Sequence, residues 1–178
     1  MFKPRHEVLV AMVLAAALTR LIPHPPNMTS IGALALFGGA QFSDKRAAFL
    51  VPFAALLLSD LFLGLYSHME LVYGSFALIV CIGLRLRRRR NPWRIAGASL
   101  AGSMLFFVTT NFGVWAFGSM YPKDWGGLRA CYTAAIPFFG NTLLGDGIYT
   151  LVLFGGFALL EKRFEILREA ETPSPGTA

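Results

Sequence analysis

The sequence predicts an all-α integral membrane protein, built as a bundle of six transmembrane helices. Of its 178 residues, 55% are hydrophobic and 15% are charged, whereas a soluble domain usually has about 45–50% apolar and about 25% charged residues. The apolar residues form runs that approach membrane-spanning length, with short polar breaks between them. We therefore expect one transmembrane domain over residues 1–165 and a polar, disordered cytoplasmic tail over residues 166–178.

The apolar runs place the six helices in order at about residues 7–22, 31–42, 47–66, 71–86, 95–117 and 141–160. The first run begins like a signal peptide, but no clean cleavage site follows it, so we expect it to remain as an anchor. The second is too short to cross the bilayer as a straight helix. Its glycines, Gly32, Gly38 and Gly39, indicate tight packing or a tilted, broken helix. The next three are continuous apolar runs, and a further run at 128–139, ended by Pro137, predicts a partly inserted helix leading into the sixth.

Basic residues predict the topology, because cytoplasmic loops of membrane proteins carry the excess of lysine and arginine. Four basic clusters lie near residues 3–5, 45–46, 85–94 and 162–163. All four fall on one side only if the chain crosses six times with both termini in the cytoplasm, which predicts a multi-pass protein of the bacterial inner membrane. The arginine run at 85–94 could by itself indicate contact with nucleic acid or anionic lipid. No basic face with interleaved aromatic residues accompanies it, so a topogenic loop is the simpler interpretation and no nucleic-acid partner is expected.

Two acidic residues, Asp60 and Asp146, lie within these apolar runs. A carboxyl group at membrane depth costs at least about 2.5 kcal/mol unless it faces a cavity or a partner, so such residues indicate functional sites. The alternative is an interhelical hydrogen bond that only holds the bundle together. At a rise of about 1.5 Å per residue, Asp60, Asn111 and Asp146 all fall roughly 8–9 Å below the outer ends of their helices. Three polar groups in one layer predict a pocket open to the outside.

Aromatic and polar residues near this layer complete the predicted pocket. Trp115 follows Asn111 by four residues and therefore shares its helix face, and Tyr149 follows Asp146 by three. The first outer loop cannot be helical, because Pro23 and its neighbouring prolines enforce extended backbone. This loop presents polar side chains near the pocket. The candidate substrate-binding residues are Arg20, His24, Asn27, Asp60, Tyr73, Asn111, Trp115, Asn141, Asp146 and Tyr149.

Enzymatic chemistry finds little support in the sequence. It contains no glycine-rich phosphate loop, no HExxH motif, no nucleophile elbow and no Ser/His/Asp set at one depth. Cys81 and Cys131 lie in different segments and have no metal-ligand spacing. Asp60 and Asp146 could supply the pair of an intramembrane aspartyl protease, but the motifs of those enzymes do not flank them. We therefore expect no catalytic residues, no metal and no cofactor.

The pattern resembles the substrate-binding S components of energy-coupling-factor vitamin transporters. The resemblance implies six helices, cytoplasmic termini and a ligand pocket near the outer face. Ala11 and Ala15 are similar to the small-residue surface by which S components dock on a membrane coupling subunit that works with ATPases. The chain also resembles a widespread family of uncharacterised bacterial inner-membrane proteins, through the stretches RLIPHPPNMTSIGALALFGGA, LLLSDLFLGLY, TTNFGVWAFGSMYP and CYTAAIPFFGNTLLGD.

These observations favour a membrane protein that binds a small, water-soluble vitamin or related nutrient for uptake, with the energy supplied by a partner. One alternative is a channel or proton-coupled carrier in which the carboxyl groups form part of a relay. The inner halves of the helices offer little polar lining beyond Ser99 and Ser103, which argues against a continuous path. Another alternative is a structural assembly subunit that binds a membrane partner through its alanine and glycine faces.

Overall fold

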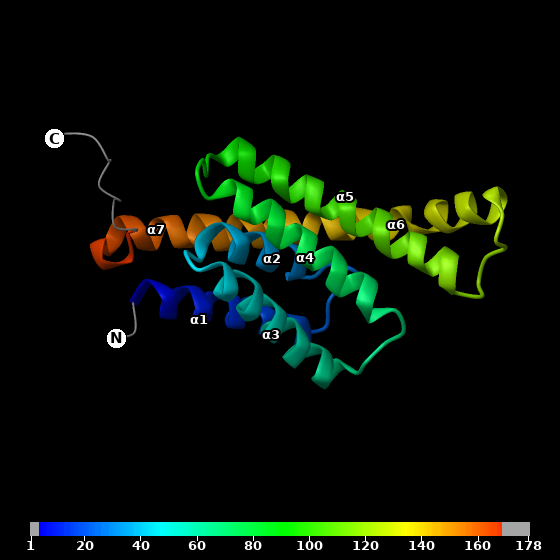
Figure 1. Cartoon of the computed structure of the whole chain (residues 1–178), viewed down its shortest axis with the longest axis horizontal. Helices are drawn as coiled ribbons and strands as arrows, with labels where there is room; N and C mark the ends of the chain where they lie inside the picture. Colours follow the sequence, from blue (N-terminus) through cyan, green and yellow to red (C-terminus); the bar gives the residue numbers. More distant parts are fainter. Residues whose placement is uncertain (1–3, 169–178) are drawn as a thin grey trace.

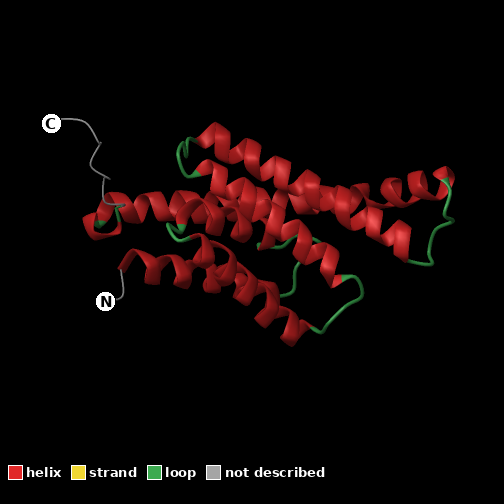
Figure 2. Ribbon diagram, in the orientation of Figure 1, coloured by secondary structure: helices red, strands yellow, loops and turns green. Residues whose placement is uncertain are grey.

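The computed structural model describes residues 4–168, and this part of the chain consists of helices joined by loops, with no strand (Figure 2). The main helices are α1 (Pro4–Leu18), α2 (Ile31–Gln41), α3 (Lys45–Leu63), α4 (Met69–Leu86), α5 (Pro92–Phe117), α6 (Trp125–Thr150) and α7 (Gly156–Arg163). Three short helical segments complete the set: η1 (Thr19–Leu21), the π-helical η2 (Leu151–Gly155) and η3 (Glu165–Leu167).

Four helices in the described residues are long and apolar enough to cross a membrane. They are Lys45–Leu63, Met69–Leu86, Pro92–Phe117 and Trp125–Arg163, the last formed by α6, η2 and α7 in continuous succession. The first two helices, α1 and α2, are shorter. The all-helical, membrane-type fold is therefore confirmed, with four membrane-length helices.

The two described ends of the chain lie at the same end of the bundle, which we call the proximal end (Figure 1). Arg5 in α1 forms an ion pair with Glu161 in α7 and donates a hydrogen bond to the carbonyl oxygen of Leu167 at 2.6 Å. At the opposite, distal end, the hairpin of α5 and α6 extends beyond the ends of α3 and α4 (Figure 1). The helices therefore do not end in a common plane.

The centre of the bundle is α2, whose residues are all buried except Gly32. It runs antiparallel to α1: Ser30 donates to the carbonyl oxygen of Ala16 at 2.8 Å, and Arg5 donates to Gln41 at 3.0 Å. An α-helix of this length spans only about 16 Å, so α2 begins inside the bundle. A helix that is apolar on every side belongs in a core, and α2 is the element that the longer helices surround.

Small residues allow the other helices to approach α2 closely. A Cβ built on Gly39 would lie 2.3 Å from the carbonyl oxygen of Val80, and one built on Gly83 would lie 2.4 Å from that of Leu36. The backbones of α2 and α4 are thus in direct contact, as is usual for small residues at membrane helix interfaces. On another side, Gly38 leaves room for the ring of Pro52.

Two sequence predictions need correction. The run at 128–139 is not a separate helix ended by Pro137, because α6 continues through Pro137 to Thr150. Proline removes only one backbone donor, and neighbouring helices in a membrane bundle tolerate this loss. The predicted disordered tail begins too early, since Leu167 is buried and η3 packs against α1 and α7. The remainder of that tail, from residue 169, lies outside the described residues.

Candidate functional site

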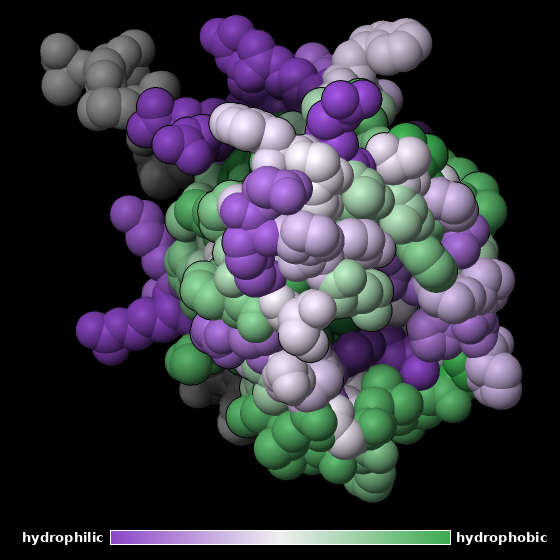
Figure 3. Space-filling view, turned by 90° about the vertical axis from the view of Figure 1, so that its right-hand side faces the viewer, coloured by the Kyte–Doolittle hydropathy of each residue, from purple (hydrophilic) through white to green (hydrophobic). Residues whose placement is uncertain are grey.

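A cavity of about 220 Å³ lies where the end of α1 and the start of α2 meet α4, α5 and α6 in the distal half. Its polar lining comes from segments far apart in the sequence, and its apolar lining includes aromatic rings. The lining residues are Arg20, Asn27, Thr29, Ile31, Gly32, Tyr66, Val72, Phe76, Phe106, Thr142 and Asp146. Seen from this end, hydrophilic atoms lie in a recess above a hydrophobic lower rim (Figure 3). The structure thus contains a polar cavity in the distal half of the bundle.

Arg20 forms one wall of the cavity and is held from behind by α3. Its Nη2 lies 2.8 Å from Oδ1 of Asp60, and its Nη1 donates to the hydroxyl of Ser59. The hydroxyl of Tyr73 donates to Oδ2 of the same aspartate at 3.0 Å. The side chains of Arg20 and Asp60 are only 9% and 1% exposed, so this is a buried ion pair. Asp60 therefore fixes the position of Arg20 and does not itself line the cavity.

Asp146 forms the opposite wall and lies against the first turn of α2. The hydroxyl of Ser103 donates to Oδ2 of Asp146 at 2.6 Å, and the backbone N–H of Ala33 faces the same carboxylate. Ser30, at the N-cap position before α2, forms no side-chain hydrogen bond that caps the helix. The first N–H groups of a helix have no partner within the helix, and its N-terminus carries partial positive charge. The carboxylate of Asp146 therefore serves as an acceptor, from another helix, for the N–H groups at the buried start of α2.

Gly32 makes this arrangement possible, because a Cβ at that position would lie 2.4 Å from Oδ1 of Asp146. A second close approach holds the first loop against α6: a Cβ on Gly145 would lie 3.0 Å from the backbone nitrogen of Thr29. Asn141 of α6 also donates to the carbonyl oxygen of Pro26 in the same loop, at 3.0 Å. Asn27 adopts a positive φ of 64° and lines the cavity. The loop is thus anchored to α6 on both sides of Asn27.

The structure brings together some of the predicted binding residues and separates others. Arg20, Asn27 and Asp146 line the cavity. Asp60, Tyr73 and Asn141 support its walls through the hydrogen bonds described above. The remaining four, His24, Asn111, Trp115 and Tyr149, do not line it.

Asn111 was predicted to share a layer with the two aspartates, and this prediction is wrong. It lies eight residues beyond Ser103 on α5, or about 12 Å further along the helix axis. Its side chain donates to the carbonyl oxygen of Phe107 on its own helix at 2.7 Å. Trp115 donates to the carbonyl oxygen of Pro122 at 2.9 Å and so ties down the loop between α5 and α6. Both residues belong to the extended hairpin.

The other two separated residues have local roles. Tyr149 donates its hydroxyl hydrogen to Thr19 at 2.8 Å, which joins α6 to the end of α1. His24 is exposed and lies with its Nδ1 2.7 Å from the carbonyl oxygen of Ile22. Sequence reasoning missed Thr29 and Thr142 as cavity residues. Their hydroxyl groups carry no signal in the sequence, because threonine also bonds to its own helix, as Thr142 does with Phe138.

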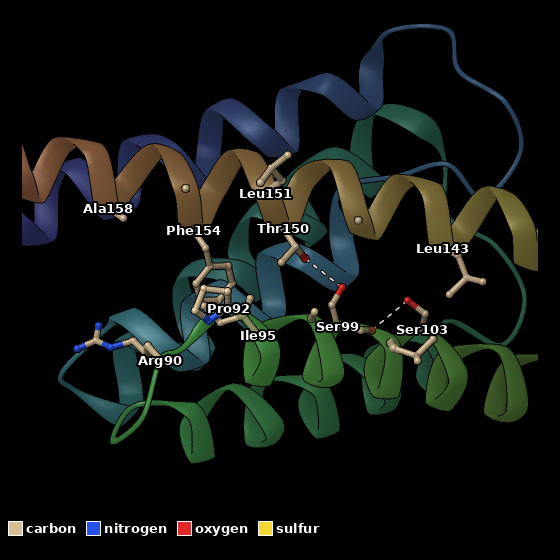
Figure 4. A pocket seen from close by; sticks show the side chains of 14 residues that line it. Arg90, Pro92, Ile95, Ser99, Ser103, Leu143, Thr150, Leu151, Phe154 and Ala158 are labelled. Atoms are coloured by element: carbon tan, nitrogen blue, oxygen red, sulfur yellow. Dashed lines mark hydrogen bonds between the residues drawn. The ribbon is translucent and has the colours of Figure 1, made fainter.

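A short polar line continues from the cavity toward the proximal end, between α5 and α6. Ser103, which donates to Asp146, lies one turn from Ser99, and the hydroxyls of Ser99 and Thr150 lie 3.1 Å apart (Figure 4). The sequence shows both serines in an otherwise apolar stretch but does not indicate their partners. Since all three side chains find partners within the protein, the line links α5 to α6 at two successive levels.

The fold and site define a class: an all-helical protein with four membrane-length helices and a small cavity with polar walls in its distal half. The chain belongs to the family described as a family of unknown function, DUF6580, whose model matches residues 1–170. This match confirms the predicted membership of an uncharacterised family. No curated protein and no solved structure matches the chain.

Proposed function

We propose that this protein is a membrane-embedded binding protein for a small, water-soluble, vitamin-like nutrient, which it captures from the outer side for uptake. The cavity between Arg20 and Asp146 is the observation that carries the proposal. A few placed polar groups within an apolar, aromatic lining are typical of small-molecule sites. Here the polar groups are Arg20, Asn27 and Asp146, with hydroxyls from Thr29 and Thr142.

The volume and charge of the cavity restrict the size and chemistry of the ligands that it can hold. Drug-sized ligands usually occupy pockets of about 300–1,000 Å³, so a cavity of about 220 Å³ suits a compact ligand. Arg20 is already neutralised by Asp60. Asp146 accepts from Ser103 and faces the backbone N–H of Ala33. A carboxylate has acceptor sites for further hydrogen bonds, which a ligand can fill. We expect a ligand rich in hydrogen-bond donors, with a ring that packs against Phe76 or Phe106, which line the cavity as a stacked pair.

The proposal includes a topology and an energy source. The basic clusters favour six crossings in the bacterial inner membrane with both termini in the cytoplasm, so that the distal cavity opens outward. Energy would come from a membrane coupling subunit with ATPases. Ala11 and Ala15 are exposed on α1, on a surface that also carries the exposed Leu14 and Leu18. Small residues of this kind let another helix approach closely, which supports docking of such a partner here.

The direct test is a thermal-shift screen of the purified protein against water-soluble vitamins and related small solutes. We expect one class of ligand to raise the melting temperature. The variant Asn27→Gly removes a cavity amide while keeping the positive φ, and it should weaken that shift. Asn111→Ala removes an amide outside the cavity and should leave it unchanged. Equal effects of the two variants, or no stabilising ligand in the panel, would contradict the proposal.

A proton-coupled carrier is the second candidate, and the polar line through Ser103, Ser99 and Thr150 favours it. In that case Asp146 would exchange protons with the ligand site. Proton flux into liposomes distinguishes the two functions. A carrier loses flux in both Asp146→Asn and Ser99→Ala, whereas a binding subunit shows no flux with or without these changes.

A further inference from the structure

A second hollow lies outside the cavity, between α5 and the continuous helix of α6, η2 and α7. It is an open groove of about 690 Å³ in the proximal half of the bundle (Figure 4). Pro92, Ile95, Ala96 and Leu100 form its α5 side, and residues from Leu143 to Ala158 form the other side. Leu100 and Leu151 are 49% and 74% exposed, so the groove faces the surroundings of the bundle.

The groove presents an apolar surface although hydroxyl groups lie along it. Ser99 and Thr150 bond to each other, and Ser103 bonds to Asp146 on the cavity side. The hydrogen-bonding capacity of these residues is therefore used within the protein. The floor of the groove offers a ligand mainly hydrocarbon contact.

Positive charge gathers at the proximal mouth of this groove. Arg90 is one of its lining residues, and its Nη1 donates a hydrogen bond to the side-chain oxygen of Gln41 in α2. On the other side, Lys162 follows Ala158 by four residues and therefore lies on the same face of α7, one turn nearer the mouth. Arg88, Arg89 and Arg94 are exposed beside Arg90. The nearest acidic residue on α7, Glu161, is paired with Arg5.

We propose that this groove binds one anionic phospholipid, with an acyl chain along the groove and the phosphate at its proximal mouth, near Lys162 and the exposed arginines. Charge complementarity carries the assignment, since basic pockets beside membrane helices bind anionic headgroups. The length also fits. From Pro92 to Ser103 the α5 side extends about 16 Å, close to half of a hydrocarbon core of about 30 Å. The site would thus hold a lipid of one leaflet and gives the arginine run a role beyond topology.

Lipid titration followed by native mass spectrometry tests this proposal. The purified protein in detergent is titrated with phosphatidylglycerol and, separately, with phosphatidylcholine of the same acyl chains. We expect one phosphatidylglycerol to bind in preference to phosphatidylcholine. Loss of one basic residue near an anionic headgroup should weaken the first binding step about fivefold in Lys162→Gln. Lys45→Gln, a charge removed from the proximal start of α3, serves as the matched control.

Filling the groove gives an independent measurement. Ala96→Phe places a ring in the groove, whereas Ala54→Phe places the same ring on an exposed position of α3. Ala96→Phe should abolish the preferred binding, and Ala54→Phe should keep it. Equal affinity for the two lipids, or equal losses in the groove variants and their controls, would overturn the proposal. Neither outcome depends on the nutrient ligand, because the cavity lies on the other side of Ser103.

Discussion

The carboxylate of Asp146 lies directly on Gly32, so that a Cβ on Gly32 would stand 2.4 Å from Oδ1 of the aspartate. This contact joins the C-terminal part of α6 to the first turn of α2, the short helix at the centre of the bundle. It explains why α2 can begin inside the protein without a side-chain cap of its own. It also places the carboxylate at the edge of the distal cavity.

Gly32→Ala should destabilise the protein, because the new methyl group overlaps a carboxylate that is itself held by Ser103. Overpacking of this kind costs about 1–3 kcal/mol. The melting temperature in detergent should therefore fall. Gly147→Ala is the matched control, since nothing lies within 4 Å of a Cβ at that position. If the two variants have the same melting temperature, the contact between Gly32 and Asp146 is not as described.

Asp146→Ala should lower stability more than Asp146→Asn does. Alanine leaves the start of α2 without this acceptor, and the hydroxyl of Ser103 keeps only the carbonyl oxygen of Ser99, at 3.1 Å. A buried unsatisfied group costs about 1–3 kcal/mol. Asparagine keeps one acceptor oxygen. A double-mutant cycle with Ser103→Ala should show coupling between the two positions. Purely additive losses would mean that Ser103 and Asp146 act independently.

Breaking the ion pair between Arg20 and Asp60 should be costly. Removing one partner of a buried pair leaves an unpaired charge and typically costs about 3–5 kcal/mol. We expect Arg20→Met to melt far lower than the wild type, and the double variant Arg20→Met/Asp60→Leu to regain part of the loss. The exposed pair of Arg168 and Glu165 is the control, and Arg168→Gln should change stability by about 1 kcal/mol or less. A small effect of Arg20→Met would contradict the buried pair.

Gly39→Ala should prevent close contact between α2 and α4. The added Cβ would meet the carbonyl oxygen of Val80 at 2.3 Å, and backbone atoms cannot move aside as a flexible side chain can. We expect a reduced yield of folded protein, measured by size-exclusion chromatography in detergent. Gly97→Ala has open space around its Cβ and should behave as the wild type. Normal folding of Gly39→Ala would show that the two helices can separate.

Asp44 should make the stability of α3 dependent on pH. Its Oδ2 accepts a hydrogen bond from the backbone N–H of Ala47 at 3.0 Å. The backbone N–H groups of Ala47 and then Arg46 lower the pKa of this carboxyl group in the folded protein. A lowered folded pKa stabilises the protein above the ordinary aspartate value of about 4, and this contribution disappears as the pH falls through the folded pKa. The difference in melting temperature between the wild type and Asp44→Ala should therefore shrink in acid, and a constant difference would contradict the cap.

The positions of most helices followed from the sequence, because backbone groups in lipid must be satisfied within each apolar segment. The second helix, for example, was predicted at residues 31–42 and is observed at Ile31–Gln41. The prediction failed at Pro137, where local propensity favours a break and the surrounding bundle keeps α6 continuous. A single proline in a membrane bundle does not decide where a helix ends.

The candidate site was only partly predictable. The sequence identified Asp60 and Asp146 as exceptional, because carboxyl groups are costly at membrane depth. Their depths were estimated on the assumption that the helices end in one plane, and the extended hairpin of α5 and α6 breaks this assumption and removes Asn111 from the site (Figure 1). Which residues the two aspartates contact also depends on packing between segments that are distant in the sequence.

The sequence by itself thus determined the apolar helices, the membrane class and the two unusual acids, since each follows from composition over a short stretch of chain. Only the tertiary structure decided that Asp60 pairs with Arg20 and that Asp146 meets the start of α2. Those contacts join residues that are far apart in the chain. They depend on the short length of α2 and on close approaches at glycine, which no local pattern encodes.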